Sequence, residues 1–187
     1  MDEEIALWPT TRQAAAIRSG EISSRALLEL LIERIERLNP ALNAVITKDY
    51  STAREAADAA DAAVARGDQL GPLHGVPITI KDALETEGIR STGGATELKE
   101  HVPTRDAPVV RAVKEAGAIV FGKTNLPRWS GDLQSFNELF GTALLPLAVV
   151  IYQAINFHHY IVDGMIWKMR KRPIHQTLGV EGQRAGA

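Results

Sequence analysis

The sequence contains no cysteine among its 187 residues. Disulfides, thiolate metal sites and cysteine nucleophiles are therefore excluded, and the composition fits a reducing compartment. The first ten residues are acidic and lack the basic and apolar regions of a signal peptide. We therefore expect a cytoplasmic protein.

A strong net charge is also missing. The chain carries 21 Lys+Arg against 23 Asp+Glu, a net charge of −2, so no nucleic-acid partner is expected. The charge is unevenly spread along the chain. Residues 1–140 carry 16 Lys+Arg against 21 Asp+Glu (net −5), and residues 141–187 carry 5 Lys+Arg against 2 Asp+Glu (net +3). This change of sign predicts that the last 47 residues are a segment of a different kind.

Helical and strand patterns alternate in the first part. Apolar residues at three- and four-residue steps predict a helix that starts at Ser23 or Ser24 and ends at Asn39, before Pro40. An alanine-rich helix follows over 51–66, capped by Ser51 or Thr52. Further on, a strand over 76–80, a helix from Pro108 to Gly117 and a strand over 118–122 form the pattern of a parallel βαβ unit. The sequence therefore predicts an α/β fold.

Lys81 directly follows the first of these two strands, and Lys123-Thr124-Asn125 follows the second. Ligands bind at the carboxyl ends of parallel strands in open α/β sheets. A lysine that loses water there has a lowered pKa and can act as a general base. The alternative is a lysine that ends a strand and keeps its charge in water.

Three segments resemble the amidase signature family: GPLHGVPITIKD (71–82), RDAPVVRAVKEAGAIVFGKTN (105–125) and GDLQSFNELFGT (131–142). The resemblance covers roughly residues 5–142. It implies a mixed sheet flanked by helices, hydrolysis of carboxylic amides, a small-molecule amide substrate, and no metal or organic cofactor. It also implies that Lys81 is the catalytic base. In the family that lysine draws a proton through a bridging serine from a nucleophilic serine, which then forms an acyl-enzyme.

The resemblance stops before the serine-rich segment of the family. After Thr142 the chain continues with ALLPLAVVIYQAINFHHY, and no serine follows Ser135, so neither serine of the relay can be placed. The nearest substitutes, Ser91, Ser130 and Ser135, match neither position and are expected to be loop hydroxyls. We therefore expect an incomplete amidase-like domain over 1–142, inactive alone and with Lys81 as its catalytic residue, followed by an unrelated tail over 143–187.

Two other functions stay open for such a chain. It could be a non-enzymatic fragment that binds a partner or a membrane surface, or a fragment of an amidotransferase subunit. Thr92-Gly93-Gly94 could offer backbone amides to a phosphate. No P-loop lysine follows at the required spacing, so a plain turn is the preferred interpretation.

The tail has an apolar run over 143–151 that is too short for a membrane span, and Pro146 interrupts it. An aromatic and basic group follows it: Trp167, Lys168, Arg170, Lys171 and Arg172. This order predicts a helical or membrane-proximal tail that binds a membrane surface weakly through 143–172. His158 or His159 with Asp163 could hold a metal, but two or three ligands are too few, and solvated histidines are expected instead.

Overall fold

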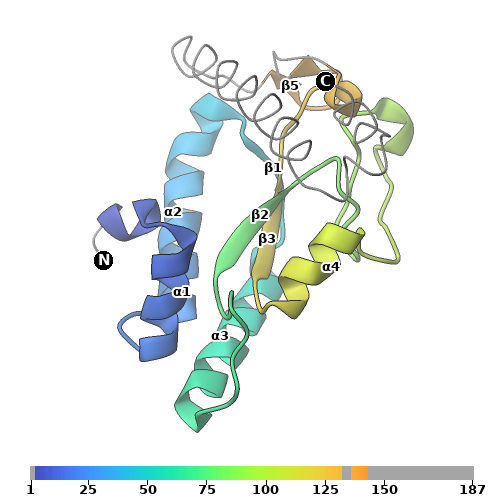
Figure 1. Cartoon of the computed structure of the whole chain (residues 1–187). Coiled ribbons are helices and arrows are strands. Elements are labelled where there is room, and N and C mark those ends of the chain that lie inside the picture. Colours follow the sequence, from blue (N-terminus) through green and yellow to red (C-terminus); the bar gives the residue numbers. More distant parts are fainter. Residues whose placement is uncertain (1–2, 132–135, 143–187) are drawn as a thin grey trace, which may run out of the picture. The chain divides into compact units, whose positions relative to one another are not determined.

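The computed structural model describes residues 3–131 and 136–142 (Figure 1). These residues belong to one unit, Met1–Leu144. The elements follow in the order η1 (Glu3–Leu7), α1 (Thr10–Ser19), α2 (Ser24–Leu42), β1 (Val45–Lys48), α3 (Tyr50–Arg66), β2 (Pro77–Lys81), η2 (Thr96–Leu98), α4 (Pro108–Glu115), β3 (Ile119–Thr124), η3 (Arg128–Ser130), β4 (Phe136–Asn137) and β5 (Gly141–Thr142).

The main sheet has three strands in the order β1-β3-β2. β2 runs parallel to the central strand β3, and β1 runs antiparallel to it. Short strands β4 and β5 form a second, antiparallel pair. The predicted mixed α/β architecture is confirmed, including the right order of strand, helix and strand around α4.

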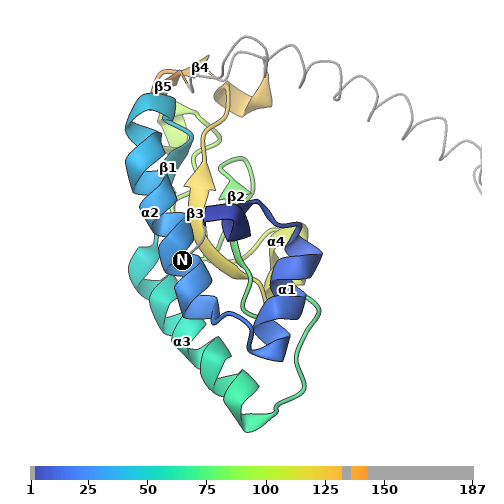
Figure 2. The ribbon, with the colours of Figure 1, turned by 90° about the vertical axis from the view of Figure 1, so that its left-hand side faces the viewer.

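Alternate residues of β3 face opposite sides of the sheet, and each side has its own core. The first side packs on α2 and α3 through Leu28, Ile32, Ala53, Ala57, Ile119 and Phe121. The second side meets α4 and the loop after β2 through Ile80, Ile89, Val110 and Val120. Figure 1 shows α2 and α4 on opposite sides of the strands, and Figure 2 shows α2 and α3 along the same side of β3.

The sequence predicts the start of α2 correctly and its end incorrectly. Ser23 caps the helix as predicted, because its Oγ accepts a hydrogen bond from the amide of Ala26 at 3.0 Å. The predicted end before Pro40 is wrong, since the helix continues to Leu42. The Asn39 side chain stabilises this longer end by accepting hydrogen bonds at 2.8 Å from the next two free amides, those of Ala44 and Val45.

The second long helix begins one residue earlier than predicted. α3 starts at Tyr50, and Asp49 occupies the N-cap position without a side-chain cap bond, so neither Ser51 nor Thr52 is the cap. None of the helices in residues 3–131 or 136–142 is long and apolar enough to cross a membrane. The predicted tail, with its membrane-binding segment and its histidines, lies outside the described residues.

Candidate functional site

Lys81 is the last residue of β2, and its side chain is exposed. The residues on either side of it point inward, since Ile80 is 8% and Asp82 1% exposed. This alternation is the ordinary consequence of strand geometry. Lys81 therefore stands at the carboxyl end of a parallel strand, opposite Thr124 of β3, with its amine directed away from the core.

The residue after Lys81 anchors the following loop. The buried Asp82 carboxylate accepts hydrogen bonds from the amide of Thr92 at 3.1 Å and from its hydroxyl at 2.5 Å. The Asp82 amide in turn donates to the carbonyl of Thr124 at 3.1 Å, which ties the loop to β3. Asp82 thus fixes both ends of the loop 82–92 next to Lys81.

The same contacts decide the role of Thr92-Gly93-Gly94. The Thr92 amide donates to the Asp82 carboxylate, the Gly93 amide to the Asp82 carbonyl at 3.1 Å, and the Gly94 amide to the Thr92 hydroxyl at 3.0 Å. All three donors are used inside the loop. The segment is therefore a turn, which was the preferred interpretation of the sequence, and not a phosphate cradle.

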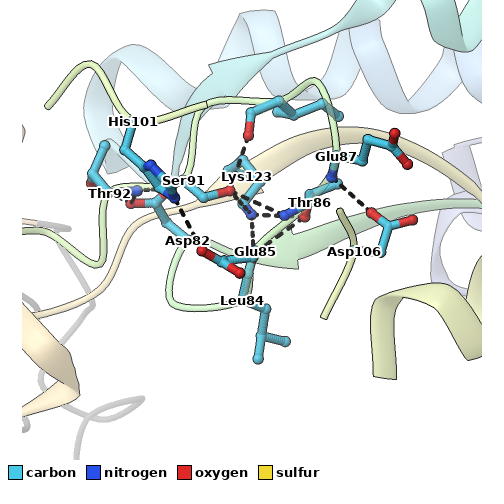
Figure 3. Close-up of polar contacts among 11 residues, drawn as sticks. Asp82, Leu84, Glu85, Thr86, Glu87, Ser91, Thr92, His101, Asp106 and Lys123 are labelled. Atoms are coloured by element: carbon cyan, nitrogen blue, oxygen red, sulfur yellow. Dashed lines mark hydrogen bonds and ion pairs between the residues drawn. The ribbon is translucent and has the colours of Figure 1, made fainter. Parts of the chain in front are cut away.

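Lys123 is the residue whose environment the sequence did not reveal. The predicted strand ended at Gly122, but β3 continues to Thr124 and includes Lys123. Its side chain is fully buried, and its Nζ donates to three neutral oxygens: Leu84 O at 2.5 Å, Ser91 Oγ at 2.8 Å and Thr86 Oγ1 at 2.9 Å (Figure 3). Burial lowers the pKa of Lys123 to about 8, while the nearby Asp82 carboxylate opposes the shift.

A bulge explains why Lys123 points toward this loop. In the pairing of β2 with β3, Ile78 faces Val120 and the next residue, Thr79, already faces Gly122, so β3 has one extra residue there. Such a residue reverses the alternation of side chains along the strand. Lys123 consequently faces the side that Val120 occupies, where the loop 82–92 covers it.

The candidate serines separate in the structure. Ser91 is buried, 4% exposed, and bonds to Lys123 instead of Lys81. Ser130 ends η3 in an exposed position with a φ of 58°, a left-handed conformation that is rare outside glycine. Ser135 lies outside the described residues. Within the described ranges no serine forms a hydrogen bond with Lys81.

A cavity of about 350 Å³ opens between the loop 82–92 and η3. Its wall includes Ser91, Leu98 and Trp129, together with Glu85 and His101, which pair at 3.1 Å between Oε1 and Nε2. Lys81 does not line it. In the described part of the chain, no group of three His, Asp or Glu side chains could hold a metal ion.

Comparison with known proteins decides the family. The family model described as Amidase matches residues 26–149. The chain belongs to the amidase family. The match runs somewhat past Thr142, where the resembling segments end.

Relatives of this amidase chain include hydrolases and amidotransferase subunits. It is 45% identical over 139 residues to the indoleacetamide hydrolase of Bradyrhizobium diazoefficiens, covering 74% of this chain and 26% of that protein. It is 42% identical over 133 residues to a Glutamyl-tRNA(Gln) amidotransferase subunit of Halorhodospira halophila, covering 71% of this chain and 27% of that protein. The chain therefore spans about a quarter of the length of these relatives.

Solved structures show the same fold. The peptide amidase of Stenotrophomonas maltophilia matches with a TM-score of 0.65 and 30% identity, over 72% of this chain and 29% of that one. Fatty acid amide hydrolase matches with a TM-score of 0.71 over 76% of this chain and 25% of that one, and at 23% identity this likeness shows the fold alone. The chain thus matches one part of the larger fold of these structures.

Proposed function

We propose that this chain supplies the catalytic lysine of an amide hydrolase, Lys81, and that the two serines of the relay come from sequence outside it. Family membership and the place of Lys81 at the carboxyl end of β2 support the lysine. The absence of any serine after Ser135 supports the second half of the proposal. The single observation that carries it is an exposed Lys81 with no serine bonded to it in the described residues.

The proposed chemistry begins at the Lys81 amine, which acts as the base. It takes a proton from a bridging serine, which takes one from the nucleophilic serine as that oxygen attacks the amide carbonyl. The ammonium then returns a proton to the leaving nitrogen, and water resolves the acyl-enzyme. A base alone has no oxygen to activate, so we expect the chain by itself to hydrolyse no amide.

A chimera tests this division of labour. Residues 1–142 are joined to the remaining three quarters of the Bradyrhizobium diazoefficiens indoleacetamide hydrolase, and ammonia release from indoleacetamide is measured. The chimera is expected to be active and the original chain inactive. Lys81→Met should slow the chimera by at least about 10²-fold, the usual contribution of a general base.

The matched control is Lys99→Met, which also removes an exposed lysine. It should leave the rate unchanged. A Lys81→Met chimera that folds and keeps its full rate would refute the role of Lys81. Ammonia release by the original chain, abolished in its own Lys81→Met variant, would refute the claim that the serines lie elsewhere.

A second candidate is part of an amidotransferase subunit. The identity of 42% to the Halorhodospira halophila protein favours it. The substrate would again be a carboxylic amide, and the liberated ammonia would pass to another acceptor. A companion chimera joins residues 1–142 to the remainder of that protein and is assayed for amidotransfer in the native complex of that protein. The two candidates are separated by which of the two chimeras turns over its substrate.

A further inference from the structure

We propose that Ser91 and Lys123 form a second nucleophile and base, independent of Lys81, which accepts the acyl group of small activated esters from the cavity beside η3. This pair lies on the side of the sheet opposite to the exposed Lys81 amine. It uses a serine that the amidase relay does not involve. The observations that support it are the contact between the two side chains, their burial, and the opening of Ser91 to a cavity.

The contact is close and is shielded from bulk water. Lys123 Nζ and Ser91 Oγ are 2.8 Å apart, and the two residues are 0% and 4% exposed. The other partners of Nζ are the Leu84 carbonyl and the Thr86 hydroxyl, and no carboxylate bonds to it. In a buried site, protonating an amine that is held only by neutral oxygens costs more free energy than protonating one in an ion pair.

Three charged side chains from neighbouring elements act on Lys123, in addition to its burial. Burial has the largest effect and lowers its pKa to about 8. The Asp82 carboxylate at the end of β2 and the Asp106 carboxylate before α4 raise it, whereas the Lys114 ammonium of α4 lowers it. A useful fraction of neutral amine is therefore present in mildly alkaline solution.

Ser91 can change its hydrogen-bond partner without moving. Its hydroxyl donates to the carbonyl of Ile89 at 3.0 Å and accepts from the amide of Thr86 at 3.3 Å. When Lys123 is neutral, rotation of the hydroxyl proton directs it to Nζ instead. The Thr86 amide then stays in place to stabilise negative charge on Oγ.

The cavity supplies access. Ser91 lines a space of about 350 Å³ whose other walls include Leu98, Trp129 and Gly93. Trp129 is 57% exposed, and a side chain at Gly93 would approach its ring to 3.1 Å, so glycine lets the indole lie over the loop. This volume accommodates a small aryl ester. Lys123 itself does not line the cavity, so the serine meets the reagent first.

The acylation step is balanced within the pair. Ser91 Oγ forms a bond to the ester carbonyl carbon while its proton passes to the neutral Nζ of Lys123. The tetrahedral intermediate then breaks the bond to the alcohol oxygen, which leaves with the proton from the Lys123 ammonium. The products are an O-acyl Ser91 and a free alcohol.

The test uses the whole chain and p-nitrophenyl acetate as the probe. We expect a burst of p-nitrophenol and a single acetyl group on the peptide that contains Ser91, located by mass spectrometry. The burst rate should rise with pH through about 8, as the Lys123 amine becomes neutral. Ser91→Ala should abolish the modification of that peptide.

Lys123→Arg distinguishes a base from a structural lysine, because a guanidinium keeps the charge and donors but does not give up its proton. It should slow acylation of Ser91 by at least about 10²-fold while thermal melting shows a folded protein. If this variant unfolds, the pH profile of the original chain decides. A rate that does not rise through pH 8 overturns the proposal.

Lys81→Met is the control that separates the two proposals. It should leave acylation of Ser91 unchanged, whatever happens to amide hydrolysis in the chimera. Absence of an acetyl group on Ser91 in the folded chain at pH 9 would overturn the second site. Equal acylation in Lys123→Arg would likewise show that Lys123 only holds the loop.

Discussion

Two lysines occupy neighbouring positions at the carboxyl ends of paired strands, and their surroundings differ completely. Lys81 ends β2 with an exposed side chain, whereas Lys123, which pairs with Ile80, is fully buried in β3. One amine faces water and the other faces two hydroxyls and a carbonyl. One sheet edge therefore holds two amines in different surroundings, because a bulge turns one of them inward.

The contrast between the two lysines should appear most strongly in the pH dependence of stability. The pKa of Lys123 is about 8 in the folded chain against an ordinary value of 10.5, so the unfolded chain binds more protons between these values. The free energy of unfolding, relative to Lys123→Met, should therefore increase as pH rises from 8 to 10.5. The shift corresponds to a gain of about 3 kcal/mol.

Urea unfolding of both chains across this range measures the gain. Taking the difference between the original chain and Lys123→Met cancels the other lysines and the tyrosines. A difference that stays flat, or that falls with rising pH, would contradict a buried lysine with a lowered pKa.

The next effect concerns the loop that separates the two lysines. Thr92→Val removes the hydroxyl that donates to the Asp82 carboxylate and accepts from the Gly94 amide. Two buried polar groups lose a partner, which should cost about 1–3 kcal/mol of stability. Thr96→Val, at an exposed threonine, is the matched control and should change stability by less than about 0.5 kcal/mol. Equal losses in the two variants would mean that the loop is not held through Thr92.

The smallest expected effect is on the exposed side. Lys81→Met removes a side chain that forms no hydrogen bond in the described structure. The free energy of unfolding, measured by thermal unfolding, should therefore change by no more than about 0.5 kcal/mol. A loss of about 2 kcal/mol or more would show that Lys81 supports the fold, and the contrast with Lys123 would fail.

The pattern of residues predicted most of the scaffold. Apolar spacing located α2 and α4, alanine content located α3, and the apolar run before Lys81 located β2 within one residue. The exposed side chain of Lys81 matches the alternative, left open by the sequence, of a lysine that ends a strand and keeps its charge in water. These features depend on local sequence, which explains why they could be predicted.

The environment of Lys123 could not be predicted in the same way. Simple alternation along β3 from Phe121 would place the Lys123 side chain on the face of the sheet that packs on α2 and α3. The extra residue in β3 turns this side chain to the opposite face. The bulge depends on contacts from other strands, since a side chain at Gly122 would lie 2.7 Å from the carbonyl oxygen of Thr47. The β-branched Thr124 was the one local sign that β3 extended further.

Chemical rescue of the Lys81→Ala chimera is the decisive test of Lys81 as the catalytic base. Small primary amines can take its place, because the change to alanine leaves a space the size of the aminopropyl group that it removes. We predict that added amines restore ammonia release from indoleacetamide, with a rate that rises with the basicity of the amine, as general base catalysis requires. A folded Lys81→Ala chimera that retains its activity without amines would contradict the assignment of Lys81 as the base.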